Sequence, residues 1–395
     1  MIEVRPAQNL GSALALATER IVAPVEGMHR AISGRWFGPL GAVGAPVRKV
    51  HDAIVSVVYG SVRLGGDTVG ITLGDRITVE ASTADSVQAF MNGLWGDTLG
   101  QRAGHTEIQM GVRDQWGASV TIGPDLATAF PGATGRLVVL VHGLFETERC
   151  WHGTETEPSL ARALEDHAEL TPVSIRYNSG LRVSDNGYRL ASLLDEVHSE
   201  WPVPVQSIAL VGHSMGGLVV RSACEAARAG GHRWVDNVDD LVTVAAPHRG
   251  SPLEKIANVA AFGLGVAAET RPLADFVNGR SVGIKDLRFG AIAEDDWKGV
   301  DPDALLHNTV GKHALASGID HHFVTGVVTS DPTHPVGAAM GDLVVRAGSG
   351  TGGQHLQPRD GVVVGGKNHF DLLHEPEVID RVLGWLAPTP VDSVS

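Results

Sequence analysis

A serine enclosed by glycines is the strongest chemical signal in this chain of 395 residues. Ser214 stands in Gly212-His213-Ser214-Met215-Gly216-Gly217, after the apolar segment 206–211 and before the helical pattern 216–229. A strand, a tight turn and a helix form the context in which G-x-S-x-G exposes a nucleophilic hydroxyl. The glycines let neighbouring backbone segments approach, and the helix N-terminus favours negative charge that develops beside it. We therefore predict that Ser214 is a catalytic nucleophile.

A second motif, His142-Gly143-Leu144-Phe145, follows the apolar segment 136–141. Acyl transfer needs two N–H donors for the negative oxygen of a tetrahedral intermediate. One comes from the residue after the nucleophile and the other from an earlier strand-to-helix loop. We predict that the backbone amides of Met215 and Leu144 form this oxyanion hole.

On these motifs, together with Ala246-Pro247-His248-Arg249-Gly250-Ser251, the chain resembles an α/β-hydrolase of the lipase/esterase type. It is similar to the branch that includes lipases and GPI-inositol-deacylase-like proteins. The resemblance covers about residues 105–390 and implies that the catalytic residues follow one another as Ser, Asp and His. The chain departs from the multi-glycine oxyanion loop of the family, and in similar lipases the shorter form accompanies longer acyl chains.

The resemblance also implies a catalytic histidine on a loop near the C-terminus. His369 lies between the apolar segment 360–364 and the helical pattern 376–386, which is where similar hydrolases carry the base. His374 is the alternative, but it lies one helical turn further on, where capping or packing is the simpler role. We predict His369.

The acid that orients the base has two candidates. Gly341-Asp342-Leu343-Val344 resembles the turn that carries the carboxylate in similar lipases, and Asp331 occupies the generic position after a strand. A buried carboxylate there would hold the imidazole in one tautomer. We predict Asp342 and keep Asp331 as the alternative, because Asp371 is too close to His369 in sequence to orient it easily.

Other candidate residues carry weaker signals. Phe145 and Trp151 could line an acyl pocket, or could simply be core residues. The stretch 348–353 (Gly-Ser-Gly-Thr-Gly-Gly) has no following Lys-Ser/Thr, so we expect a flexible loop rather than a phosphate cradle. His369 and His374 do not form an H-E-x-x-H pattern, and only two cysteines are present, Cys150 and Cys224. We therefore expect no metal, no cofactor and no disulfide framework.

Alternating strand and helix patterns must position these residues. Strands are expected at 136–141, 173–177, 206–211, 240–245, 322–327 and 360–364, and the helices between them at 158–167, 188–200 and 216–229. Such alternation predicts an α/β fold with a mostly parallel sheet and helices on both faces. A β-hairpin is expected within 105–123.

Two segments lie outside this alternation. Residues 1–104 read as an N-terminal helical extension, with apolar positions such as Leu14, Ile21, Val25 and Met28 at helical spacing. The long connection at about 252–320 is rich in Ala, Val and Gly, and we expect an inserted helical cap within the hydrolase domain 105–390. The extension is expected to pack on the main body or on a partner copy, which would make a homo-oligomer.

Charge and hydropathy narrow the partners. The chain carries 31 Lys and Arg against 45 Asp and Glu, a net charge of −14, so nucleic acid is not an expected partner. The apolar stretch 256–268 is too short to span a bilayer, and Glu3 interrupts any signal-peptide pattern. We expect a cytoplasmic protein without a transmembrane segment.

Taken together, the sequence predicts a carboxylic ester hydrolase that acts on an ester with an apolar acyl chain. The alternatives are an acyltransferase or thioesterase that uses the same triad, and a catalytically silent binding or scaffold protein.

Overall fold

A seven-stranded sheet forms the centre of the molecule, with strand order β3-β5-β4-β6-β7-β8-β9. Six strands are parallel, and β3 pairs antiparallel with β5 at one edge. The computed structural model describes residues 4–6, 78–102, 107–153, 156–265, 267, 270–305, 308, 310–311, 313–353 and 356–387, and parts of 18–60. The strands are β3 Gly111–Arg113, β4 Arg136–Val141, β5 Thr171–Arg176, β6 Ser207–His213, β7 Val238–Val244, β8 Asp320–Val327 and β9 Asp360–Gly365.

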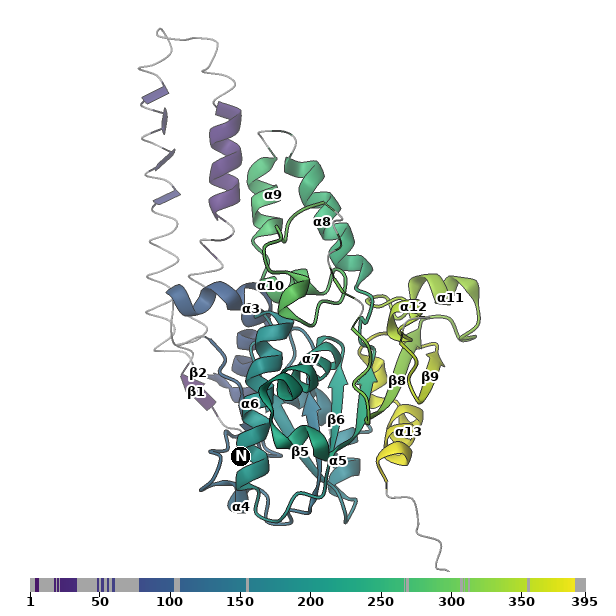
Figure 1. The fold of residues 1–395 in the computed structure, drawn as a ribbon. Helices are drawn as coiled ribbons and strands as arrows, with labels where there is room; N and C mark the ends of the chain where they lie inside the picture. The colour runs from purple at the N-terminus through teal and green to yellow at the C-terminus, as the bar shows by residue number, and fades with distance from the viewer. Residues whose placement is uncertain are drawn as a thin grey trace, which may run out of the picture.

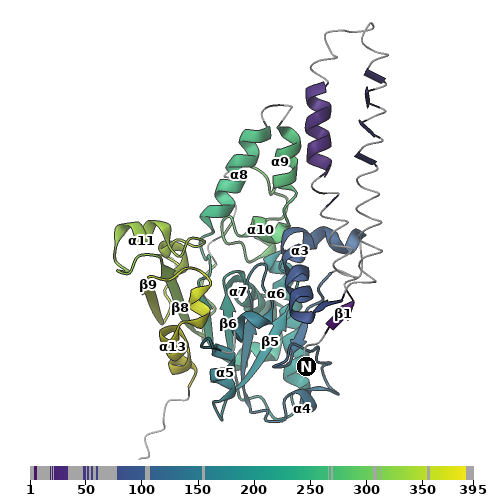
Figure 2. The same cartoon turned by 180° about the vertical axis from the view of Figure 1, so that it is seen from behind.

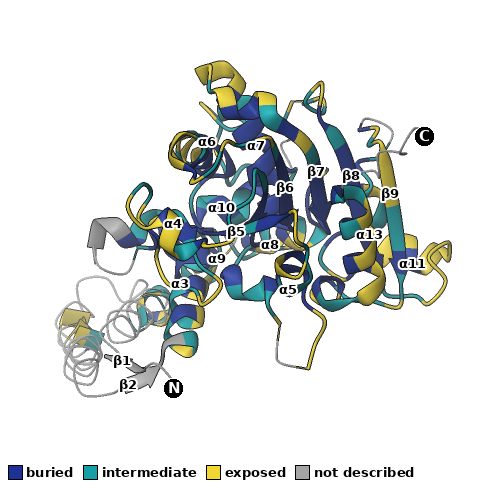
Figure 3. Cartoon of the chain, turned by 90° about the horizontal axis from the view of Figure 1, so that it is seen from below, coloured by how far each residue is buried: buried dark blue, intermediate teal, exposed yellow. Residues whose placement is uncertain are grey.

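Helices cover both faces of this sheet. Helices α6 (Val183–Glu200) and α7 (Met215–Gly230) lie on one face, and α5 (Leu160–Glu165) and α13 (Pro376–Leu386) lie on the other (Figure 3). The central strands are apolar on both sides because each face packs under a helical layer. Two buried clusters result, one under α6 and α7 and one under α5 and α13. The predicted fold class is confirmed.

Strand register brings the predicted chemistry to one edge of the sheet. Val141, the last residue of β4, pairs with Gly212 of β6, and His213 pairs with Val244 of β7. Because parallel strands end at the same edge, the loops that follow β4 and β6 leave the sheet side by side. The loop that carries His369 follows β9 at this same edge.

Three helices form a cap beyond that edge: α8 (Pro252–Gly265), α9 (Arg271–Asn278) and α10 (Val282–Asp286). Figures 1 and 2 show α8 and α9 rising away from the sheet. The helical segment 22–33 of the N-terminal region lies alongside α9 in both views. A Cβ atom on Gly27 would come within 2.7 Å of the Pro272 side chain, so the two helices are in close contact.

Helix α3 (Ala81–Arg102) joins the N-terminal region to the rest of the molecule, with a kink at Trp95. Ser281, at the start of α10, donates to the Gly93 carbonyl at 2.6 Å, and the Asn178 side chain donates to the Gly96 carbonyl at 3.1 Å. The boundary predicted at 104/105 stays a prediction. Of the apolar positions expected there, Leu14 and Ile21 lie outside the described residues, while Val25 is exposed.

Two local expectations differ from the structure. Only β3 of the expected hairpin is a strand; Ser119 forms an isolated bridge to Arg113, and the chain then turns into α4 (Leu126–Ala129). The glycine-rich stretch at 348–353 begins within a short helix, α12 (Ala347–Gly350).

The remaining short elements are β1 Val4–Pro6, β2 Thr78–Glu80, η2 Glu148–Trp151, η3 Arg233–Asn237, η4 Glu294–Asp296, α11 Pro335–Met340 and η5 Asp371–His374. No helix within the described ranges is long and apolar enough to cross a bilayer.

Candidate active site

Ser214 occupies the turn between β6 and α7 in a strained backbone conformation. Its φ is 51° and its ψ is −120°, a region that residues with a Cβ seldom adopt. Its amide donates to the Val244 carbonyl at 2.8 Å, which ties the turn to β7. The turn is possible because Gly216 allows α7 to start against β4: a Cβ atom there would lie 2.2 Å from the Val141 carbonyl oxygen.

His369 and Asp342 form a buried pair. Nδ1 of His369 lies 2.8 Å from Oδ2 of Asp342, and the two side chains are 4 % and 1 % exposed. An ionised carboxylate only accepts hydrogen bonds, so Nδ1 carries the proton and Nε2 is left to act as a base. The other carboxylate oxygen of Asp342 accepts from the amides of Val344 and Val345 at 3.0 and 2.8 Å. The main chain of the turn therefore holds the carboxylate in place.

The alternative acids and bases lie elsewhere. Asp331 is exposed and accepts from the Thr333 amide and hydroxyl within its own turn. His374 donates to the Pro158 carbonyl at 3.1 Å. Asp371 is exposed and accepts from the Asn368 amide. None of the three lines the cavity that contains Ser214.

Ser214 and His369 line one cavity of about 370 Å³ beneath the cap. Its walls are mostly apolar and come from the loop after β4, from α8, from α10 and from the loop after β9. The apolar residues that line it are Leu144, Phe145, Leu253, Ala257, Ile284, Leu287, Val344 and Phe370. The cavity can therefore hold an apolar group directly against the serine hydroxyl and the imidazole.

The predicted oxyanion residues come from the start of α7 and from the loop after β4, and the two approach at Ser214: a Cβ atom on Gly143 would lie 3.0 Å from the Ser214 Cβ. Met215 is the first residue of α7, so its amide is one of the N-terminal amides without an acceptor inside the helix. Leu144 lines the cavity. The amides on either side of it are engaged: Gly143 donates to Glu146 Oε2 at 2.6 Å, and Phe145 donates to the Ser179 hydroxyl at 3.3 Å.

Glu146 and His213 form a second buried pair that the sequence analysis missed. Oε2 of Glu146 lies 2.8 Å from Nδ1 of His213, and Nε2 of His213 lies 3.3 Å from the His369 carbonyl oxygen. Burial by itself would raise the pKa of Glu146, but His213 and the Gly143 amide lower it to about 2. Burial opposes protonation of His213, yet Glu146 and the His369 carbonyl raise its pKa. The Glu146–His213 pair connects the loop after β4 to the loop that carries His369.

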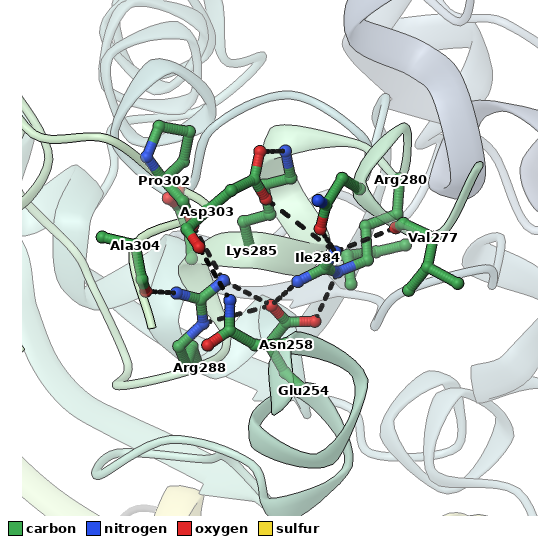
Figure 4. Close-up of polar contacts among 12 residues, drawn as sticks. Glu254, Asn258, Val277, Arg280, Ile284, Lys285, Arg288, Pro302, Asp303 and Ala304 are labelled. Carbon is green, nitrogen blue, oxygen red and sulfur yellow. Dashed lines mark hydrogen bonds and ion pairs between the residues drawn. The ribbon is translucent and has the colours of Figure 1, made fainter. Parts of the chain in front are cut away.

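A charged cluster closes the cap above the cavity (Figure 4). Glu254 of α8 pairs with Arg280 at 2.5 Å and with Arg288 at 3.1 Å, and all three side chains are less than 10 % exposed. Lys285 pairs with Asp303 at 2.9 Å. Because Glu254 and Arg280 also line the cavity, this cluster holds α8 against the segment around α10 as its roof.

Two other sequence expectations concern this region. Phe145 lines the cavity, whereas Trp151 is fully buried in the core under α5 and α13 and is not part of the lining. Within the described part of the chain, no group of three or more His, Cys, Asp or Glu side chains could hold a metal ion.

The sheet and its covering helices have the α/β-hydrolase fold. A family model described as the PGAP1-like alpha/beta domain matches residues 152–326, which include Ser214 and the cap. The resemblance found in the sequence is confirmed over this part of the chain. His369, Asp342 and the loop after β4 lie outside the matched range.

Solved structures with a similar fold include two lipases and an esterase. A Bacillus licheniformis lipase in its mature form is 19% identical, with 63% of this chain and 91% of that chain covered and a TM-score of 0.43. A Pyrobaculum calidifontis esterase is 15% identical, with coverage of 64% and 75% and a TM-score of 0.38. A Staphylococcus hyicus lipase is 13% identical, with coverage of 64% and 94% and a TM-score of 0.35. No curated protein matches the chain in sequence.

Proposed function

We propose that this protein is a serine hydrolase that cleaves carboxylic esters. Ser214 is the nucleophile, His369 the general base, and Asp342 the residue that orients the imidazole. One observation carries the proposal: Ser214 and His369 line the same cavity, while Nδ1 of His369 forms a hydrogen bond with the buried Asp342 carboxylate. This is the set of roles that acyl transfer through a serine requires.

In the proposed reaction, Oγ of Ser214 attacks the ester carbonyl carbon as Nε2 of His369 takes the hydroxyl proton. The carbonyl π electrons move to oxygen, and the amides of Leu144 and Met215 donate to that oxygen. Collapse of the intermediate expels the alcohol, which takes the proton from His369. Water then attacks the acyl-enzyme with the same base, and the acid and free Ser214 are released.

The cavity favours an ester with an apolar acyl group. Its walls are mostly aliphatic and aromatic side chains, and apolar walls bind apolar chains by removing both from water. The charged groups at the cavity, Glu254 with Arg280 and Glu146 with His213, are already paired with one another. We therefore propose an uncharged acyl chain as the group that enters.

A panel of p-nitrophenyl esters from C2 to C12 tests both parts of the proposal. We expect longer chains to be preferred, and we expect Ser214→Ala to lower kcat by about 10⁴–10⁶-fold. Ser192→Ala, at an exposed serine on α6, is the matched control and should keep full activity.

Labelling with a fluorophosphonate separates an enzyme from a silent scaffold. Wild type should be labelled at Ser214, and Ser214→Ala should not. Absence of labelling in the wild type would reject the hydrolase.

The ester assay has two further informative outcomes. If an added alcohol captures most of the acyl group, the protein is an acyltransferase. A strict preference for the C2 ester would reject the apolar acyl chain.

A further inference from the structure

Helix α8 has a cavity on each of its two sides. Leu253, Glu254 and Ala257 face the cavity of Ser214. Lys255, Ile256 and Val259 face away from it, toward a groove of about 760 Å³ that runs between α8 and α11. We call this the α8–α11 groove; its apolar walls are Ile256, Val259, Ala260, Ala338 and Ala339.

A polar cavity of about 450 Å³ continues from this groove. Arg249 and Lys255 line both spaces, so the two adjoin at these side chains. Arg221 and His248 also line the polar cavity. We call it the Arg221 cavity. It shares no lining residue with the cavity of Ser214.

Arg221 is a buried cation without a carboxylate counter-ion. It is 6% exposed, and no described carboxylate lies within 4.0 Å of its guanidinium. Its contacts are neutral acceptors: Nη1 donates to Nδ1 of His248 at 3.1 Å, and Nη2 donates to the His313 carbonyl at 3.1 Å. The nearby acids are engaged with His313, since Asp296 lies 2.8 Å and Glu225 3.5 Å from its ring nitrogens.

His248 remains neutral in this arrangement and orients Arg221. Arginine has no acceptor atom, so Nδ1 of His248 carries no proton, and its Nε2 donates to the Thr243 hydroxyl at 3.0 Å. Burial and the neighbouring Arg221 charge both hold the pKa of His248 well below its usual range. Burial lowers the pKa of Arg221 to about 10, although the charges of Glu225 and Asp296 partly offset this cost. An anion that accepts hydrogen bonds from the guanidinium would offset it further.

The other charges in these two spaces are also positive. Arg249 and Lys255 line both spaces, and Arg346 lines the groove. No Asp or Glu is among the described lining residues of either space. Lys255 lies over the Phe289 ring, and burial together with Arg346 and Arg249 lowers its pKa. Three cations therefore line the Arg221 cavity and a fourth, Arg346, lines the adjoining groove, in a chain of net charge −14. This indicates a site for a multiply charged anion.

We propose that the Arg221 cavity binds a phosphate group, and that the α8–α11 groove holds an alkyl chain attached to it. A phosphate monoester has up to two charges and three oxygens, which suit several arginine forks better than a single carboxylate does. The apolar walls beside Arg249 and Lys255 suit an alkyl chain. The site lies outside the proposed catalytic cavity and does not depend on the chemistry of Ser214.

Isothermal titration calorimetry of the full chain with octyl phosphate tests the proposal. Arg249→Ala and Lys255→Ala remove cations at the junction without opening the core, and each should weaken binding about tenfold. Arg381→Ala, at an exposed arginine on α13, is the matched control and should bind like the wild type. Arg221→Lys keeps the charge but removes the planar fork, and should also weaken binding.

Three further titrations separate the possible ligands and sites. Inorganic phosphate should bind more weakly than octyl phosphate, and uncharged octyl glucoside should not bind here. If inorganic phosphate or octyl glucoside bound as tightly as octyl phosphate, an amphipathic ligand would be rejected. Ile284→Trp narrows the cavity of Ser214 from α10, a helix that lines neither the α8–α11 groove nor the Arg221 cavity, and should leave octyl phosphate binding unchanged. Loss of binding in Ile284→Trp but not in Arg249→Ala would overturn the proposal, as would the absence of binding in the wild type.

Discussion

Asp342 is held by the backbone of its own turn. One carboxylate oxygen accepts hydrogen bonds from two backbone amides. These hold the other oxygen toward His369, and no neighbouring cation is needed to position it. Replacement by asparagine preserves the shape but presents an amide group that can favour the wrong imidazole tautomer. This makes the proposed role of Asp342 testable with an isosteric change.

We predict that Asp342→Asn lowers kcat on the preferred ester by about 10³–10⁴-fold, because the tautomer that leaves Nε2 basic is no longer favoured. The matched control is Asp331→Asn, at the exposed alternative, which should retain wild-type rates. Steady-state kinetics of both variants make the measurement. Equal losses in the two variants would contradict the assignment.

Glu146 and His213 predict a pH dependence of stability. The lowered pKa of Glu146 stabilises the folded state above the ordinary value of 4.5, and this contribution is lost as the pH falls towards 2. The raised pKa of His213 stabilises it below the ordinary value of 6.5, and this contribution is lost as the pH rises through the folded-state value. The pair therefore stabilises the fold most between about pH 4.5 and 6.5.

We predict that Glu146→Gln lowers the free energy of unfolding by about 3 kcal/mol within this window, and by less on either side. Denaturant titrations from pH 3 to pH 9 measure it. Glu196→Gln, at an exposed position on α6, should follow the wild-type curve. A loss that is the same at every pH would show that packing rather than charge is responsible.

Helix α3 contacts the proposed oxyanion loop through Gly93 and Phe90. A Cβ atom on Gly93 would lie 2.2 Å from the Phe145 ring, and Phe145 adopts a φ of 67° directly after Leu144. The same ring packs on Phe90 of α3, with ring centroids 5.2 Å apart. The position of the loop after β4 therefore depends on a helix that precedes the sheet in the chain.

We predict that Gly93→Ala displaces Phe145, lowers kcat/KM about tenfold and destabilises the fold by about 1–3 kcal/mol. Gly263→Ala on α8 is the control, because its Cβ meets open space, and it should stabilise the helix by about 0.5–1 kcal/mol. Ester kinetics and thermal melts measure both. Unchanged kinetics in Gly93→Ala would show that α3 does not set the loop.

At the scale of elements, the strands and most helices could be predicted because their signals are local. The strand predicted at 136–141 has the same bounds as β4, and the motif around Ser214 lies at the predicted junction of strand and helix. Helix α6 begins five residues earlier than predicted, since Ser184, Asn186 and Gly187 are buried by tertiary contacts rather than by apolar spacing.

Among the residues of the candidate site, only those that lie in a sequence motif could be predicted. Ser214, Asp342 and His369 lie in recognisable turns and loops. Glu146 and His213 are 67 residues apart, so nothing local indicates that they pair. Trp151 follows the predicted oxyanion loop closely in sequence but turns into the core through η2, which spacing alone could not reveal.

For the whole molecule, one buried arginine connects α3 to the sheet. Arg176 of β5 binds Glu148 at 2.5 Å and Asp85 of α3 at 2.9 Å, and all three side chains are 6% exposed or less. Removal of the cation would take a buried partner away from both carboxylates, although Arg149 still lies 3.7 Å from Asp85. Loss of a buried partner of this kind is strongly destabilising.

We predict that Arg176→Met lowers the free energy of unfolding by about 3–5 kcal/mol. Arg189→Met removes an exposed arginine whose ion pair with Glu107 spans 4.0 Å, and it should cost about 1 kcal/mol or less. Chemical denaturation of both variants measures the difference. Similar values would show that α3 is not tied to the sheet by charge.

Helix α8 contributes one wall to each of two separate spaces, so a movement of this helix affects both of them. A sideways displacement of this helix enlarges one space and reduces the other. Any molecule that selects a displaced helix on one side therefore changes affinity on the other, and thermodynamic reciprocity requires the factor to be equal in both directions. Titration of each ligand at saturating amounts of the other would measure that factor directly.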